Sequence, residues 1–154
     1  SEEHTSERVY EKFRVNLSIK SKNGLDFTLS AGIVWILIAF VWTLNWKSYD
    51  KSVITFMVGV LLIPLALLFS KLFKTTWTDT ANPLQPLGLW LNFAQLFYFP
   101  FFFFFLIKLP DYFVMVYAII TGGHLFPYAW FYKTNLYAVF AGILTVGAML
   151  CGLL

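Results

Sequence analysis

Five long apolar stretches set the limits on what this chain can fold into. They cover residues 27–46, 52–70, 84–107, 112–132 and 134–154. A helix needs about 20 predominantly apolar residues to cross about 30 Å of hydrocarbon, and each stretch approaches or exceeds that length. A membrane strand would be shorter and would alternate in polarity, and none of the stretches alternates. The sequence therefore predicts an all-α polytopic transmembrane helical bundle with about five spans.

Composition argues against a soluble domain of the same length. Of the 154 residues, 59% are hydrophobic and only 12% are charged. A soluble domain this small has too much surface for its volume to hide so much apolar material. The partner that the composition predicts first is therefore the lipid bilayer, and nothing in the sequence indicates nucleic acid.

Residues 1–25 differ from the rest of the chain. Val9, Phe13 and Leu17 recur at a spacing of four among charged residues, which predicts one apolar stripe on a helix. Asn23-Gly24 is a plausible helix stop. We interpret residues 1–25 as an amphipathic cytoplasmic or interfacial helix and residues 26–154 as the bundle. The alternative is a segment that docks on a partner.

The distribution of lysine and arginine predicts the orientation. Cytoplasmic loops carry an excess of these residues. Eight of them lie on the amino-terminal side of the predicted spans and three on the other side. We therefore expect a multi-pass protein of the cell membrane with a cytoplasmic amino terminus. The eight are Arg8, Lys12, Arg14, Lys20, Lys22, Lys71, Lys74 and Lys133, and the three are Lys47, Lys51 and Lys108.

A candidate ligand-binding site comes from polar residues inside two predicted spans. If the third and fourth spans form a tight hairpin, residues at equal depth have numbers with a constant sum, which places His124 level with Gln95. Asn92 and Tyr128 then lie one helical turn from Gln95 and His124, respectively. The alternative interpretation is that these four residues only hold the helices together through hydrogen bonds.

Enzyme chemistry finds little support in the sequence. No phosphate-binding glycine loop, zinc-binding cysteine pair or nucleophile motif is present. We predict no catalytic residue, no metal site and no cofactor, and an enzyme is the less favoured class. The acids nearest the membrane lie at span ends or in loops rather than at mid-membrane, and they are Asp26, Asp50, Asp79 and Asp111.

The fifth apolar stretch carries a helix-packing seam. Small residues recur there at intervals of three and four, which lets helix backbones approach closely at a shallow crossing angle. The pattern leaves open whether the partner helix belongs to the same chain, to a second copy or to another membrane subunit. The seam consists of Ala138, Ala141, Thr145, Ala148 and Gly152.

Three segments resemble a family of small bacterial integral membrane proteins of unknown function. They are residues 17–27, residues 82–100 beginning Asn82-Pro83-Leu84-Gln85-Pro86, and residues 119–132 with Thr121-Gly122-Gly123-His124. The resemblance implies an inner-membrane protein of about six helices and no particular activity. The apolar end of the chain also leads us to expect a further carboxyl-terminal span in the natural protein.

Two functions remain open from the sequence. The first is the binding or permeation of a small ligand, lipid or ion within the bundle. The second is a non-catalytic membrane sensor, scaffold or partner subunit. A lipid-directed enzyme with His124 as general base is a third, weaker hypothesis, because no acid or nucleophile accompanies that histidine.

Overall fold

The computed structural model describes residues 2–77 and 81–154, and the described residues form helices joined by short connections, with no strand. The all-α prediction is confirmed. The elements are α1 (Glu2–Lys20), η1 (Lys22–Gly24), α2 (Leu25–Thr43), α3 (Ser48–Val60), α4 (Leu62–Phe73), α5 (Gln85–Ala94), η2 (Gln95–Tyr98), α6 (Phe99–Lys108), η3 (Pro110–Tyr112), α7 (Phe113–His124), α8 (Phe126–Phe131) and α9 (Leu136–Leu153), where η marks a 3₁₀ turn.

Five helical segments of the described chain are long and apolar enough to cross a membrane. This indicates a multi-pass membrane protein and agrees with the number of spans that the sequence predicts. The segments are Lys22–Thr43, Ser48–Phe73, Gln85–Lys108, Pro110–Phe131 and Leu136–Leu153.

Three of these segments are interrupted shortly before a proline. A proline inside a helix lacks an N–H, and its ring clashes with the carbonyl four residues earlier, so the helix kinks or tightens there. Before Pro100 the interruption takes the form of the 3₁₀ turn η2, which gives way to α6. The interruptions lie at Leu61, Gln95–Tyr98 and Leu125, and the prolines that follow them are Pro64, Pro100 and Pro127.

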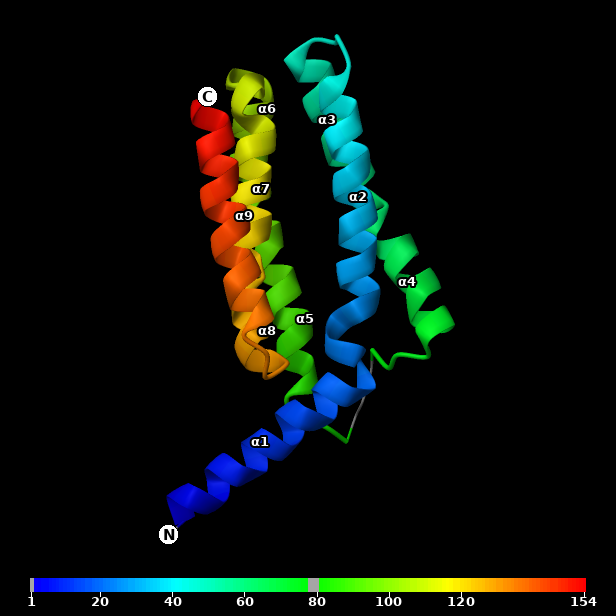
Figure 1. Cartoon of the computed structure of the whole chain (residues 1–154), viewed down its shortest axis with the longest axis vertical. Helices are drawn as coiled ribbons and strands as arrows, with labels where there is room; N and C mark the ends of the chain where they lie inside the picture. The colour runs from blue at the N-terminus through cyan, green and yellow to red at the C-terminus, as the bar shows by residue number, and fades with distance from the viewer. Residues whose placement is uncertain (1, 78–80) are drawn as a thin grey trace.

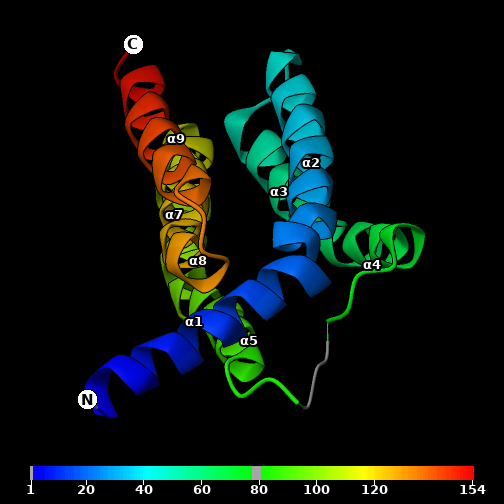
Figure 2. The same ribbon diagram turned by 60° about the horizontal axis from the view of Figure 1, so that its bottom comes forward.

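The helices form two groups. Figure 1 shows α2, α3 and α4 on one side and α5 to α9 on the other, with α1 crossing beneath. The turned view of Figure 2 shows α4 leaving the side of α2 beyond the interruption. The groups meet at Tyr117 of α7, whose ring centroid lies 5.5 Å from that of Trp35 on α2. Gly59 of α3 makes room for the Tyr117 hydroxyl, because any side-chain carbon there would overlap with it.

Two apolar cores stabilise the second group at different depths. One contains Phe102, Phe113 and Val116, where α6 and α7 pack together. The other contains Leu17 of α1 with Tyr128 and Phe131 of α8. The second core connects the amino-terminal helix to the bundle, and the candidate site borders it through Tyr128.

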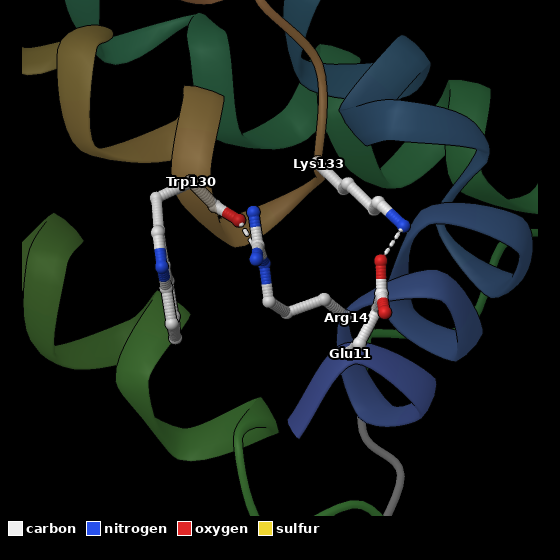
Figure 3. A network of polar contacts seen from close by, with 4 residues as sticks. All are labelled: Glu11, Arg14, Trp130 and Lys133. Carbon is white, nitrogen blue, oxygen red and sulfur yellow. Dashed lines mark hydrogen bonds and ion pairs between the residues drawn. The ribbon is translucent and has the colours of Figure 1, made fainter. Parts of the chain in front are cut away.

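The amino-terminal helix is anchored by its carboxyl-terminal half. Leu17 is buried, Phe13 is half-buried and Val9 is exposed, so only part of the predicted stripe contacts the bundle. Figure 3 shows the polar contacts of this helix. The Arg14 guanidinium stacks on the Trp130 ring at 4.6 Å and donates a hydrogen bond to the Trp130 carbonyl.

The ion pair between Glu11 and Lys133 gives a first testable prediction. The Lys133 ammonium donates a hydrogen bond to the Glu11 carboxylate, and this bond and the positive charge lower the pKa of Glu11. Lys133→Ala should therefore raise that pKa toward its ordinary value. The pair's contribution to docking of α1 is present above the ordinary pKa and is lost as pH falls through the lowered value.

The measurement is a ¹³C NMR titration of the Glu11 carboxyl carbon in the wild type and in Lys133→Ala. Lys12→Ala, on the same exposed helix, is the control and should leave the Glu11 titration unchanged. Identical titrations in all three proteins would contradict the pairing.

The basic residues assigned to the amino-terminal side do meet at one end of the molecule. At the end where α1 lies, the Thr76 amide donates a hydrogen bond to the Lys20 carbonyl, and the Lys133 ammonium donates one to the Glu11 carboxylate. At the opposite end, the Ser52 hydroxyl lies 3.0 Å from the Pro110 carbonyl. The helix ends named here therefore lie on the two sides to which the count of lysine and arginine assigns them. The cytoplasmic placement of the amino terminus stays a prediction.

Candidate functional site: a polar cluster on α5, α7 and α8

Three of the four predicted site residues lie together. Asn92 of α5, His124 at the end of α7 and Tyr128 of α8 share one hydrogen-bond acceptor, the Asn92 side-chain oxygen. The Tyr128 hydroxyl donates to this oxygen at 2.8 Å, and His124 Nε2 lies 3.2 Å from it. The Tyr128 oxygen also lies 3.4 Å from the Gly88 carbonyl.

Local sequence brings the three side chains to one place. The interruption at Leu125, ahead of Pro127, sits between His124 and Tyr128, which face one another with ring centroids 5.4 Å apart. On the opposite helix, Gly88 permits close approach, because a Cβ there would lie 2.9 Å from the Phe131 ring. The glycine and the proline together let α5 pack against α8 with Asn92 beside the histidine.

The cluster lies well inside two helical segments that are long and apolar enough to cross a membrane. Asn92 is seven residues from the start of its segment at Gln85, and His124 is seven residues from the end of its segment at Phe131. At 1.5 Å per residue, both lie about 10 Å inside their helical segments. Helical segments of 22 and 24 residues exceed the thickness of the hydrocarbon only slightly, so a bilayer spanned by both segments would hold the cluster within its apolar layer.

The hydrogen bonds determine which groups stay available. His124 must carry a proton on Nε2 to donate to the Asn92 oxygen, so a neutral imidazole presents an unprotonated Nδ1. Among the described residues, neither His124 Nδ1 nor the Asn92 amide nitrogen has a hydrogen-bond partner. The cluster therefore offers one acceptor and one donor beyond its internal bonds.

These available groups are not sealed inside the protein. Asn92 is exposed and His124 is half-buried, whereas Tyr128 is buried. Leu89 and Leu96, about one turn on either side of Asn92, are also exposed. A bilayer would therefore place the Asn92 amide against lipid or against a molecule dissolved in the lipid.

Gln95 does not join the cluster. It begins the 3₁₀ turn η2, and its side chain makes no hydrogen bond to His124 or to another residue of the described chain. The hairpin rule assumes two regular helices, whereas Gln95 begins a 3₁₀ turn, in which each residue turns by about 120° instead of about 100°. His124 meets Asn92, one helical turn from the partner that the constant sum predicts.

The small-residue seam lies against α7 of the same chain. Ala141 is buried, and the other four seam residues are half-buried. The Thr145 methyl group faces Gly122 of α7, while its hydroxyl donates to the Ala141 carbonyl on its own helix at 2.7 Å. Gly152 lies directly against the Met115 side chain. The seam is therefore occupied within one chain, which the sequence alone left open.

A second polar cluster surrounds Asp26, which sequence reasoning placed only at a span end. Asp26 is 1% exposed, and one of its oxygens accepts hydrogen bonds from the Thr75 hydroxyl at 2.7 Å and from the Trp77 indole at 2.5 Å. The other oxygen accepts from the Phe27 amide at 2.9 Å. The Trp77 ring also stacks on Phe27, with centroids 4.7 Å apart.

The sequence contains a weak signal that could have indicated this second cluster. Asp26 is followed by Ser30 one turn later, and a polar pair at this spacing on an apolar helix indicates an inward-facing stripe. Ser30 is fully buried and donates to the Asp26 carbonyl at 2.7 Å. Of the other acids near the membrane, Asp50 and Asp111 are exposed, and Asp79 lies outside the described residues.

Comparison with known proteins assigns the chain to a family. The family of unknown function DUF7010 matches residues 10–154, so the chain belongs to that family. This agrees with the resemblance to a small helical family of unknown function. The comparisons with curated proteins and with solved structures gave no match.

Proposed function

We propose that this member of the DUF7010 family binds the polar group of a small membrane-borne molecule at Asn92, His124 and Tyr128. The observation that carries the proposal is the pair of available atoms, the Asn92 amide nitrogen and His124 Nδ1, inside two segments that are long and apolar enough to cross a membrane. Polar groups without partners are costly in lipid. A ligand that hydrogen-bonds both atoms would remove that cost.

The chemistry of the cluster restricts the ligand. The available atoms are one donor and one acceptor, which match a hydroxyl, an amide or a protonated carboxyl group. No acidic or basic side chain of the described chain hydrogen-bonds this cluster, so an ion would gain no charged partner here. The exposed Leu89 and Leu96 offer apolar surface for a hydrocarbon tail. An uncharged amphiphile fits these features best.

A non-catalytic partner subunit is the second candidate. In that case the Asn92 amide and His124 Nδ1 would hydrogen-bond a helix of another chain, as polar residues do between membrane helices. The exposure of Asn92 supports this candidate as well. The two candidates differ in what co-purifies with the protein: an uncharged amphiphile in the first case, and a second protein chain in the other.

The test compares molecules retained by wild type, His124→Leu and Tyr128→Phe after purification in mild detergent. Solvent extraction and mass spectrometry identify the retained amphiphiles. Tyr117→Phe is the matched control, because Tyr117 is a phenol of the same helical segment as Tyr128 but lies in a different cluster. We expect one uncharged amphiphile to be enriched in the wild type and the control and lost from the two site variants.

Stability supplies the second readout for His124→Leu. The variant loses one interhelical hydrogen bond, which costs about 1–2 kcal/mol at most, so it should still insert and fold. Equal retention of every amphiphile by all four proteins would contradict the ligand proposal. Loss of a co-purifying protein chain from the site variants, with lipids unchanged, would favour the partner subunit instead.

A further inference from the structure

A groove at the far end of the molecule from α1 has no part in the proposed site. It has a volume of about 560 Å³ and lies where the α2–α3 connection enters α3. Its lining combines two aromatic rings, one carboxylate and two aliphatic side chains. These residues are Trp46, Tyr49, Asp50, Val53 and Ile54.

The groove has a polar end and an apolar end. Asp50 and Tyr49 lie in the first turn of α3, and Val53 and Ile54 follow one turn deeper toward the membrane. One turn corresponds to about 5 Å along the helix. The groove therefore changes from carboxylate and aromatic rings to aliphatic side chains over about one helical turn.

The chemistry of the polar end favours an ammonium group. Trp46 and Tyr49 are each 50% exposed, so their ring faces are open to a ligand. Aromatic faces attract ammonium groups, and a carboxylate beside them adds a charge of opposite sign. Asp50 is exposed and has no ion pair or hydrogen bond with any other residue of the described chain.

The neighbouring lysine does not compete for this carboxylate. Lys51 directs its ammonium over the Trp42 ring, 5.0 Å from the centroid, which shows the same chemistry within the protein itself. Lys47 is exposed and immediately precedes α3. Lys47 is adjacent in sequence to Trp46, which lines the groove, and its positive charge suits the phosphate next to an ammonium group.

We propose that this groove binds a zwitterionic phospholipid with an ammonium headgroup, taken from the surrounding bilayer. The ammonium lies on Trp46 and Tyr49 beside Asp50, the phosphate lies near Lys47, and the acyl chains follow Val53 and Ile54. The site is separate from the cluster around His124, and its test does not depend on that cluster.

Native mass spectrometry on protein from nanodiscs tests the proposal. The nanodiscs contain equal amounts of phosphatidylethanolamine and phosphatidylglycerol, which differ in the ammonium group. We expect the wild type to retain phosphatidylethanolamine preferentially. Asp50→Asn and Trp46→Leu should each reduce that preference by about fivefold, the factor that corresponds to one exposed ammonium contact.

Asp111→Asn is the matched control, because Asp111 is an exposed acid at the same end of the bundle and does not line the groove. The preference of Asp111→Asn for phosphatidylethanolamine over phosphatidylglycerol should equal that of the wild type. Circular dichroism should show unchanged helicity in all variants. Equal retention of the two lipids by the wild type, or an unchanged preference in both groove variants, would overturn the proposal. Displacement of the lipid by soluble ethanolamine at similar concentration would also overturn it, because a free amine would then be the ligand.

Discussion

Replacement of Asp26 by leucine is expected to reduce the free energy of unfolding by about 2–5 kcal/mol. Leucine has the same branched skeleton with larger methyl groups in place of the oxygens and accepts no hydrogen bond, so the Thr75 hydroxyl and the Trp77 indole lose their shared acceptor. A buried donor left without a partner costs about 1–3 kcal/mol. Asp26→Asn should cost less, because its amide oxygen can still accept one or both of these bonds.

Unfolding by a graded rise in sodium dodecyl sulfate, followed by tryptophan fluorescence, measures this effect. In Asp26→Leu, the lower free energy of unfolding should be accompanied by faster hydrogen exchange at residues 75–77, because Asp26 holds that segment against α2. Asp111→Leu is the control, since Asp111 is exposed. If the two leucine variants unfold at the same detergent concentration, the buried network does not stabilise the fold.

Leucine at Gly122 should destabilise the bundle by forcing α7 and α9 apart. A Cβ at Gly122 would lie 2.9 Å from the Leu144 Cβ and 3.4 Å from the Thr145 backbone nitrogen. Neither atom is the end of a flexible side chain, so the helices themselves must move. Overpacking of this kind costs about 1–3 kcal/mol, and a whole leucine side chain lies at or above the upper end of that range.

The matched control for this prediction is Gly142→Leu on α9. A Cβ at Gly142 meets no other atom within 4 Å, so this variant adds the same side chain on the open side of the helix. Both variants are compared by detergent unfolding and by the yield of a disulfide between cysteines introduced on α7 and α9. Equal destabilisation by the two leucines would show that the seam does not determine the packing.

The fold was predictable from the sequence because its main constraint, the length of each apolar stretch, can be measured along the chain. Apolar length alone indicates a spanning helix, since no other element satisfies its own backbone in lipid. The small-residue seam was predictable for the same reason, because its spacing defines one helix face. Its partner was not, since spacing on α9 carries no information about α7.

The candidate site was predictable only as far as regular geometry applies. Asn92 and His124 were expected on facing helices within about one turn of each other, and the structure places them in contact. Gln95 was placed beside His124 by a rule that ignores the 3₁₀ turn before Pro100. The burial of Asp26 depends on Thr75 and Trp77, which lie about fifty residues away in a connecting segment without helical periodicity.

The anchoring of α1 has a consequence for how the molecule is assembled. This helix is synthesised before the five apolar segments, yet the Arg14 bond to Trp130 spans 116 residues and the Glu11 bond to Lys133 spans 122. Neither partner exists until the fourth apolar segment has been translated. During most of synthesis, therefore, α1 lacks these two contacts, and Leu17 lacks its core neighbours Tyr128 and Phe131. Closure of α1 onto the bundle is a late event, and it completes only when the loop before α9 has left the ribosome.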